Sequence, residues 1–300
     1  MKKIAFPQVG AEDGAPAAGL ERFAWLSIAA AVVTIALKTG AFALTGSVGL
    51  LSDAAESLVN LGAAVIALVS LRVAARPPDY NHDYGHGKAE YFSAGAEGLM
   101  IFVAAAVILY SAVHRLLHPV ALESLGWGLL ISTAASVING VVGVVLIRAG
   151  RAHRSVTLTA DGRHLMTDVV TSAGVIVGVL LVALTGWAPL DPLVAIAVGL
   201  NILVTGYRLI SSSVTSLLDA ALPPSDLAAL HAALDGVRSP EVDFGEIRTR
   251  ESGRQRFVSL TVRLPGDWTV ERAHEVTDRV ERAIGQGLPG AQVQTHVAPA

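Results

Sequence analysis

The sequence predicts a membrane protein in two parts: an all-α bundle of six transmembrane helices and a C-terminal cytoplasmic α+β domain. The 300-residue chain is 52% hydrophobic and only 16% charged, with a mean hydropathy of +0.55. This composition is too apolar for an ordinary soluble protein of this length. Six apolar stretches of bilayer length follow one another, and the chain becomes polar only after Leu222.

The charged residues exclude several classes of protein. Residues 1–218 carry 13 basic and 13 acidic side chains, whereas residues 219–300 carry 9 and 12, for a net charge of -3. No basic tract is present, which argues against nucleic acid as a partner. The chain has no cysteine, so disulfides, thiolate zinc sites and iron–sulfur clusters are excluded. Any metal site must use His, carboxylate, amide or carbonyl ligands.

Each apolar stretch approaches the roughly 20 residues that cross about 30 Å of hydrocarbon. The stretches lie at residues 22–46, 48–72, 92–117, 125–147, 157–184 and 189–217. The first is too long for a cleaved signal peptide, and five more follow it. Residues 1–21 are expected to form a flexible cytoplasmic N-terminus. Asp191 and Pro192 predict the start of the sixth span, with Asp191 as N-cap and Pro192 at the first helical position.

The basic residues predict the orientation. If the chain starts in the cytoplasm, nine Lys and Arg residues gather on that side: Lys2, Lys3, Arg22, Arg72, Arg76, Lys88, Arg148, Arg151 and Arg154. The opposite connections contain no Lys or Arg, and Arg115, near the outer end of the third span, is the nearby exception. By the positive-inside rule, both termini are expected in the cytoplasm and the protein in the inner (plasma) membrane.

The soluble part is expected to begin near residue 219, because Pro223 and Pro224 break the last apolar run. Ser225 or Asp226 opens a short amphipathic helix to about Leu234. Alternating residues then predict strands at 243–250 and 255–264, a helix at 269–284 and a strand at 291–297. This αββαβ order predicts a small sandwich with helices on one face of a sheet.

Polar residues recur at helical spacing in two of the spans. Asp53, Glu56 and Asn60 form one stripe in the second span, and Asp161, His164 and Asp168 form the other in the fifth. At 1.5 Å per residue, Asn60 and Asp168 lie about 18 Å and about 16 Å into their spans, close to the midplane. Ionisable groups at this depth indicate a functional site.

The four deepest side chains suit a divalent cation. Glu56, Asn60, His164 and Asp168 offer two carboxylates, an amide and an imidazole, which do not select one metal. His164 binds either metal or a proton, so the two compete. The alternative is that these residues are structural polar contacts between helices. Asp53 lies nearer a helix end, as does Asp161, where capping or water contact competes with a role as accessory ligand.

Two further features carry donors. Lys38 and Glu97 are single intramembrane charges, which are expected to be paired or to snorkel rather than to ligate. The connection between the second and third spans contains Asp79, His82 and His86, a set that either holds a second ion at the cytoplasmic surface or is a solvated polar loop.

The chain resembles the cation diffusion facilitator family, in particular its zinc/iron-type bacterial members. The resemblance rests on Gly46–Val48, Leu51–Asn60, Tyr84–Glu90, Ala160–Asp161 with His164 and Asp168, Asp191–Pro192, Arg248–Arg250 and Ser252–Gly253. It covers nearly the whole chain after Arg22. It implies a homodimeric metal/proton antiporter with six membrane helices and a metallochaperone-like cytoplasmic domain.

The resemblance also implies site residues. The family's transport ligands match Glu56, Asn60, His164 and Asp168, but the family usually has Asp or His at the first position and Asp at the second. Its loop site matches Asp79, His82 and His86. In the tail, His274 and His296 match ligands, while other ligand positions hold Gly245, Thr261 and Ala298. Glu246 is the one replacement to consider there.

The leading expectation is therefore an exporter, not an enzyme, that exchanges a cytoplasmic divalent cation for protons by alternating access. Zn2+, Fe2+, Mn2+, Co2+ and Ni2+ all remain open as cargo, and no prosthetic group is expected. One alternative is a membrane metal sensor that does not transport. The other, an intramembrane metallohydrolase, is disfavoured because the chain lacks H-E-x-x-H or a comparable general-base motif.

Overall fold

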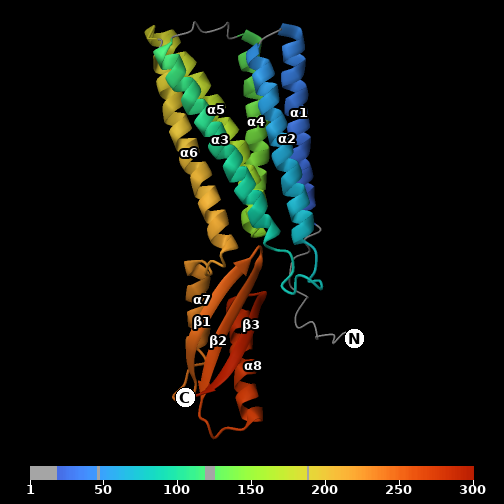
Figure 1. Ribbon diagram of the computed structural model, residues 1–300, viewed down its shortest axis with the longest axis vertical. Coiled ribbons are helices and arrows are strands. Elements are labelled where there is room, and N and C mark those ends of the chain that lie inside the picture. The colour runs from blue at the N-terminus through green and yellow to red at the C-terminus, as the bar shows by residue number, and fades with distance from the viewer. Residues whose placement is uncertain (1–18, 46–47, 119–125, 188) are drawn as a thin grey trace. The chain divides into compact units, whose positions relative to one another are not determined.

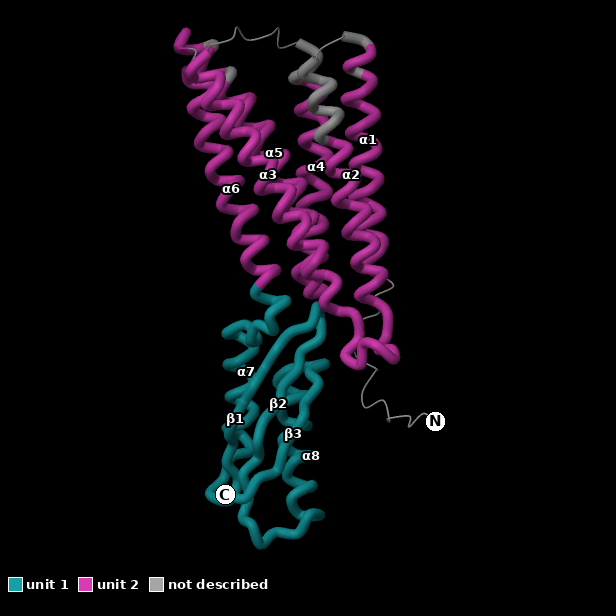
Figure 2. The backbone as a smooth tube through the Cα atoms, in the orientation of Figure 1, with its two compact units in different colours: residues 1–16, 215–300 teal, residues 17–214 magenta. Residues whose placement is uncertain are grey.

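The computed structural model describes residues 19–45, 48–118, 126–187 and 189–300 (Figure 1). Within those ranges, only the backbone is described for residues 41, 44–45, 48–56, 126–129, 179 and 183. The flexible leader expected at residues 1–21 lies mostly outside the described residues. Two compact units are present, residues 17–214 and residues 215–300 (Figure 2).

The first unit is the predicted helical bundle. Its six helices are α1 (Glu21–Thr45), α2 (Val48–Ala74), α3 (Ala89–Leu117), α4 (Gly126–Ala152), α5 (Val156–Thr185) and α6 (Leu190–Leu217). All six are long and apolar enough to cross a membrane. The described chain thus confirms the six-helix expectation, and most observed ends lie within five residues of those predicted.

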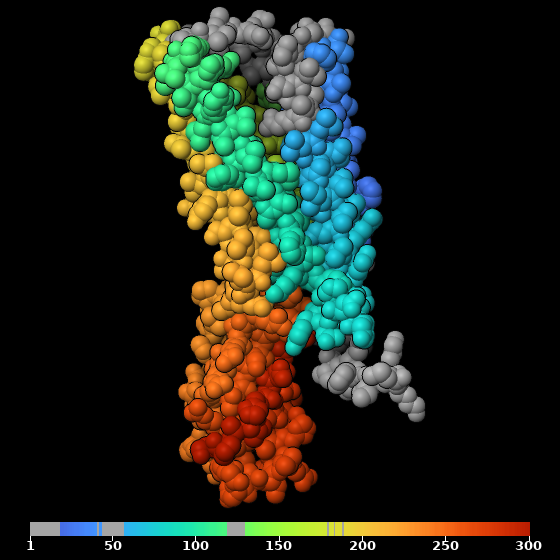
Figure 3. Space-filling model, viewed as in Figure 1, coloured from blue at the N-terminus to red at the C-terminus, as the bar shows by residue number. Residues whose placement is uncertain are grey.

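Helix α5 belongs to both halves of the bundle core. Leu158 and Leu165 of α5 pack in a cluster with residues of α1, α2 and α4. Ala160, on another side of the same helix, packs with residues of α3 and α6. In the space-filling view, α3 runs diagonally across the visible face between α6 and α2 (Figure 3). Because α5 packs against α1, α2 and α4 on one side and against α3 and α6 on another, its polar side chains can reach several helices.

Two glycines allow helices to approach closely. A Cβ atom on Gly162 of α5 would lie 2.8 Å from the carbonyl oxygen of Gly143 and 2.9 Å from the backbone nitrogen of Ile147, both on α4. A Cβ atom on Gly206 of α6 would lie 2.8 Å from the backbone nitrogen of Phe102 on α3. Small residues at such crossings let backbones pack directly, as is common in membrane bundles.

Two helix starts differ from the sequence-based prediction. Helix α3 begins at Ala89, three residues early, because buried Glu90 is hydrogen-bonded to the start of α5 and so needs no water. Helix α6 begins at Leu190, and the bond from Leu193 N–H to the Pro189 carbonyl places Asp191 inside the first turn. The prediction of Asp191 as N-cap, with Pro192 first in the helix, was therefore wrong.

The carboxylate of Asp191 has a different partner. It pairs with Arg115 at 3.2 Å, the basic residue that stood as an exception to the charge rule. The pairing partly compensates the charge of Arg115 at that end of the bundle.

The second unit has the predicted αββαβ order. Its elements are α7 (Pro224–Asp235), β1 (Asp243–Ser252), β2 (Gln255–Leu264), α8 (Val270–Gly287) and β3 (Ala291–Pro299). The sheet order is β1-β2-β3, with β1 and β2 antiparallel and β2 and β3 parallel. The parallel pair requires a crossover, which α8 supplies.

The core of this unit lies on one face of the sheet. Alternate β2 residues from Val258 to Leu264 are buried against Leu230 and Leu234 of α7 and Val280 and Ile284 of α8. Both helices thus cover the same face, as the alternation in the sequence predicts.

Candidate metal centres

Three of the four predicted transport ligands lie together in the bundle. The Asn60 side-chain amide on α2 donates a hydrogen bond to the Asp168 carboxylate on α5 at 2.5 Å. The other amide atom, Oδ1, is 2.9 Å from Nε2 of His164 on α5. Asn60 is 5% exposed and His164 is 4% exposed, while Asp168 is half-buried. The polar stripes of α2 and α5 therefore face each other.

The contacts define how the protons are arranged. A carboxylate only accepts hydrogen bonds, so the Asn60 nitrogen must face Asp168 and its oxygen must face His164. An amide oxygen also only accepts, which means that Nε2 of His164 carries a hydrogen in this arrangement. A metal ion can bind Nε2 only after that hydrogen has left or has moved to Nδ1. Metal and hydrogen therefore compete for Nε2 of His164.

Asn139 on α4 joins the same group. Its side-chain nitrogen donates to Asp168 at 3.2 Å, and the residue is 6% exposed. The sequence-based prediction missed it, although an Asn in the middle of the apolar fourth span was the available signal. Asn139 holds the Asp168 carboxylate from a third helix.

Lys38 of α1 interacts electrostatically with Asp168. This electrostatic interaction agrees with the expectation that the intramembrane lysine is paired with a charge rather than a ligand. A lysine ammonium is a cation without a free lone pair, so it can balance a carboxylate but cannot bind metal while protonated.

The remaining stripe residues divide into two groups. The side chains of Asp53 and Glu56 lie outside the described residues, although their backbone belongs to α2. Asp161 is 1% exposed. The N-cap of α5 is Ser155, which accepts a bond from Leu158 N–H at 3.3 Å. Asp161 is therefore neither a helix cap nor in contact with water. These were the two alternatives to a role as accessory ligand that the sequence left open.

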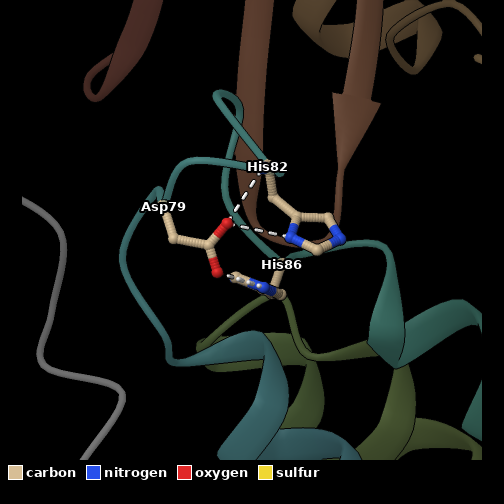
Figure 4. A group of neighbouring side chains, drawn as sticks. All are labelled: Asp79, His82 and His86. Carbon is tan, nitrogen blue, oxygen red and sulfur yellow. Dashed lines mark hydrogen bonds and ion pairs between the residues drawn. The ribbon is translucent and has the colours of Figure 1, made fainter. Parts of the chain in front are cut away.

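The loop residues form a compact donor cluster (Figure 4). Asp79, His82 and His86 each offer one ligand atom, and these atoms lie within 4.8 Å of one another. Oδ1 of Asp79 is 3.0 Å from Nδ1 of His82, and Oδ2 is 3.4 Å from Nε2 of His86. The two imidazole rings have centroids 4.3 Å apart. One carboxylate and two imidazoles suit a zinc-like ion with an open fourth position.

The backbone of this loop fixes Asp79. Its Oδ1 atom accepts hydrogen bonds from the backbone N–H groups of Asn81 and His82, both at 2.9 Å. Gly85 has a φ of +77°, which closes the turn before His86 and which glycine adopts without strain. The bond to the His82 side chain, with those to the backbone, lowers the pKa of Asp79 below its usual range. The carboxylate is therefore charged and ready to bind a cation.

Glu90 fastens the end of this loop to the helix that carries His164. Its carboxylate accepts hydrogen bonds from the Ser155 hydroxyl at 2.5 Å and from the Thr157 N–H at 3.4 Å. Thr157 in turn donates its hydroxyl to the Glu90 carbonyl at 3.3 Å. The starts of α3 and α5 thus lie side by side, at the same end of the bundle as the loop cluster.

The predicted tail ligands have few donors around them. His274 on α8 is exposed and lies 3.8 Å from Asp278. His296 on β3 pairs across the sheet with Thr261, which pairs with Gly245 on β1, so this row offers a single imidazole. A Cβ atom on Gly245 would lie 3.2 Å from the Arg263 guanidinium. Glu246 has a φ of 49° at a β-bulge.

Together, the apolar helices define an integral membrane protein with a group of buried polar side chains inside its helical bundle. Residues 24–218 match the cation efflux transmembrane domain, and residues 222–300 match the cytoplasmic domain of cation efflux proteins. The chain therefore belongs to the cation efflux family, the cation diffusion facilitators, which is a family of transporters.

The chain is also similar to individual proteins. The chain is 49% identical over 277 residues to "Uncharacterized transporter sll1263" of Synechocystis, which covers 92% of this chain and 89% of that protein. It is 32% identical over 282 residues to the "Cation-efflux pump FieF" of Escherichia coli, covering 93% of each. A solved structure of CzrB in its zinc form shows 34% identity, covers 26% of this chain and 90% of that one, and has a TM-score of 0.25.

Proposed function

We propose that the protein exports a divalent metal cation from the cytoplasm in exchange for protons. The observation that carries the proposal is the hydrogen-bonded group of Asn60, His164 and Asp168, which joins α2 to α5 inside the bundle. Glu56 is proposed as the fourth ligand, one helical turn from Asn60. The family supports cation efflux, and two carboxylates in the set match the charge of a divalent ion.

The exchange follows from the proton at His164. When His164 is protonated at both ring nitrogens, metal that binds at Nε2 releases one proton and leaves a neutral imidazole with its hydrogen on Nδ1. Once the metal leaves on the far side, a proton returns to His164 and restores the hydrogen bond to Asn60. Metal and proton thus occupy the site alternately, which is the requirement for antiport by alternating access.

The accessory sites are proposed in descending order of support. Asp79, His82 and His86 form a loop site that holds a second ion at the cytoplasmic surface, supported by the mutual approach of their ligand atoms. His274 and His296 are proposed only as single donors in the tail. We place the protein in the inner membrane as a homodimer with both termini in the cytoplasm, and we propose no enzymatic activity.

The test is metal flux in reconstituted vesicles with defined inside and outside pH. Purified full-length protein is expected to move Zn2+, Fe2+ or Mn2+ across the membrane, and an opposing proton gradient should accelerate it. Flux that ignores the pH gradient would contradict antiport. Metal binding without any flux would favour the sensor, and turnover of a substrate would favour the hydrolase.

A further inference from the structure

Two buried carboxylates lie between the transport group and the end of the bundle that carries the loop cluster. Glu97 on α3 and Asp161 on α5 are 0% and 1% exposed and interact electrostatically with each other. The interface around them is apolar and close, since Ala94 and Ile101, which flank Glu97 on the same face of α3, pack with Ala160 of α5. The two acids are therefore buried near each other at the interface of α3 and α5.

These carboxylates lack the partners that buried charges need. Glu97 accepts one hydrogen bond, from the Ser93 hydroxyl at 3.2 Å, through Oε1. Its Oε2 atom and both Asp161 oxygens have no hydrogen-bond partner in the described part of the chain. The Ser27 hydroxyl of α1 is close enough to stabilise the ionised Asp161 carboxylate, but it makes no hydrogen bond of ordinary geometry. Three carboxylate oxygens and one hydroxyl thus remain available.

No basic side chain compensates the pair. Among the described residues, neither carboxylate forms an ion pair with Lys or Arg. Arg163, two residues beyond Asp161, lies on the exposed side of α5. Within the described ranges, His164 is the one neighbour of Asp161 that can carry positive charge, and the transport group already uses it. Two unpaired carboxylates in hydrocarbon are costly, so positive charge must enter the space when both are ionised.

Glu97 and Asp161 lie at a shallower depth in the bundle than the transport group. Glu97 is about 12 Å from the start of α3 and Asp161 about 8 Å from the start of α5, whereas Asp168 is about 18 Å in, at 1.5 Å per residue. Glu90 binds the starts of these two helices together, so the depths are counted from the same end. Asp161 and His164 are three residues apart and thus one helical turn from each other.

We propose that Glu97 and Asp161 form a second intramembrane site for a divalent cation, with Ser27 as an auxiliary oxygen donor. An all-oxygen set favours hard ions such as Mn2+, in contrast to the transport group with its imidazole. An ion bound here is one helical turn from His164, so it can pass from the Glu97–Asp161 pair to the transport group. This loading role rests on the proposed export function, whereas the binding itself does not.

The experiment counts Mn2+ ions on the full-length protein in detergent by electron paramagnetic resonance. The background variant combines His82→Ala, His86→Ala and Asp168→Asn, which removes the loop cluster and weakens the transport group. This background should retain one Mn2+ per chain. Adding Glu97→Gln should weaken that binding at least about tenfold, and adding Glu275→Gln, an exposed acid on α8, should leave it unchanged.

A second variant, with checks on folding, shows whether lost Mn2+ binding is caused by misfolding. Asp161→Asn removes the acid from the other helix and should abolish the same Mn2+ signal, with size-exclusion profile and helix content as in the background. Unchanged Mn2+ binding in both amide variants would overturn the proposal. So would a background that binds no Mn2+ and shows the infrared band of a protonated carboxyl that Glu97→Gln removes, because the pair would then hold a proton.

The outcome separates this proposal from the export function. If wild-type vesicles show no flux but the Mn2+ signal depends on Glu97 and Asp161, the site stands and the export function falls. If wild-type vesicles transport metal and both amide variants bind Mn2+ normally, the reverse holds.

Discussion

Asn60 of α2 and Asp168 of α5 are 108 positions apart in the chain, yet they are joined by a hydrogen bond of 2.5 Å. The oxygen of the same amide contacts the His164 imidazole, so one side chain of α2 links both residues of α5. In the proposed site, metal at this oxygen would replace its hydrogen bond to His164, whereas the bond from the amide nitrogen to Asp168 can persist.

Asp168→Ala is expected to abolish metal flux while leaving the protein inserted in the membrane. The change removes a carboxylate that Asn60 and Asn139 both contact, so a cation at this depth loses half of its neutralising charge. Flux in vesicles is the measurement, and Asp278→Ala on the exposed side of α8 is the control. Full efflux by the Asp168 variant would exclude the site.

Replacing His82 and His86 together by Ala should remove metal bound at the loop but preserve most of the flux. The two imidazoles supply two of the three donor groups of that cluster, which lies outside the membrane-spanning helices. Metal content of the purified variant and vesicle flux are measured in parallel. A loss of flux as large as in Asp168→Ala would make the loop part of the translocation path.

His82→Ala alone should raise the pKa of Asp79 toward its ordinary value of 3.8, because the bond to His82 is the largest cause of its lowered pKa. A carboxylate with a lowered pKa stabilises the folded loop at pH values above the ordinary pKa, and that stabilisation is lost as pH falls through the lowered value. The wild-type loop should therefore keep its structure to lower pH than the variant. Carboxyl NMR of Asp79 below pH 5 tests this, and identical titration curves would contradict it.

Gly162→Ala should destabilise the bundle by about 1–3 kcal/mol, the usual cost of forcing a methyl group into a close-packed contact. The new Cβ would meet the Gly143 carbonyl of α4 at 2.8 Å. Thermal unfolding in detergent measures the loss. Gly62→Ala on α2, where a Cβ meets nothing within 4 Å, serves as control and should show no loss.

Hydrophobicity and polar periodicity predict much of this molecule. They identify the six spans, the αββαβ order and the two facing stripes, because bilayer length and helical spacing are local properties of the chain. They do not identify Asn139 as a partner of Asp168, because a single Asn in a span does not show which neighbouring helix its side chain faces. Nor do they show that Glu97 meets Asp161, because packing between α3 and α5 depends on contacts distant in sequence.

The loop cluster and the tail histidines differ in how well the sequence predicts them. Asp79, His82 and His86 are close in sequence, and the turn at Gly85 brings their ligand atoms together. His274 and His296 belong to different elements, so only the sheet register shows that His296 faces Thr261 rather than another ligand. Sequence spacing therefore predicts donor clusters within one loop better than clusters assembled across elements.

Asn60→Asp is expected to change metal selectivity more than folding, because the two side chains have nearly equal volume. The carboxylate would replace the amide that bonds to Asp168, so two acids would face each other in the empty site and attract a cation more strongly. All divalent ions should bind more tightly and leave more slowly. Zn2+ should gain most if its ligands close toward a tetrahedron, whereas the neutral amide of the native protein favours Mn2+ or Fe2+ in competition.

The added charge should also shift the pH dependence of transport. A third negative ligand attracts protons as well as metal, so protons compete more strongly and the pH optimum for metal uptake should rise. Binding and flux of Zn2+, Mn2+ and Fe2+ are compared for both proteins between about pH 6 and 8. If selectivity and pH dependence are the same as in the native protein, Asn60 is not a ligand, and the site must be rebuilt from Asp53, Glu56, His164 and Asp168.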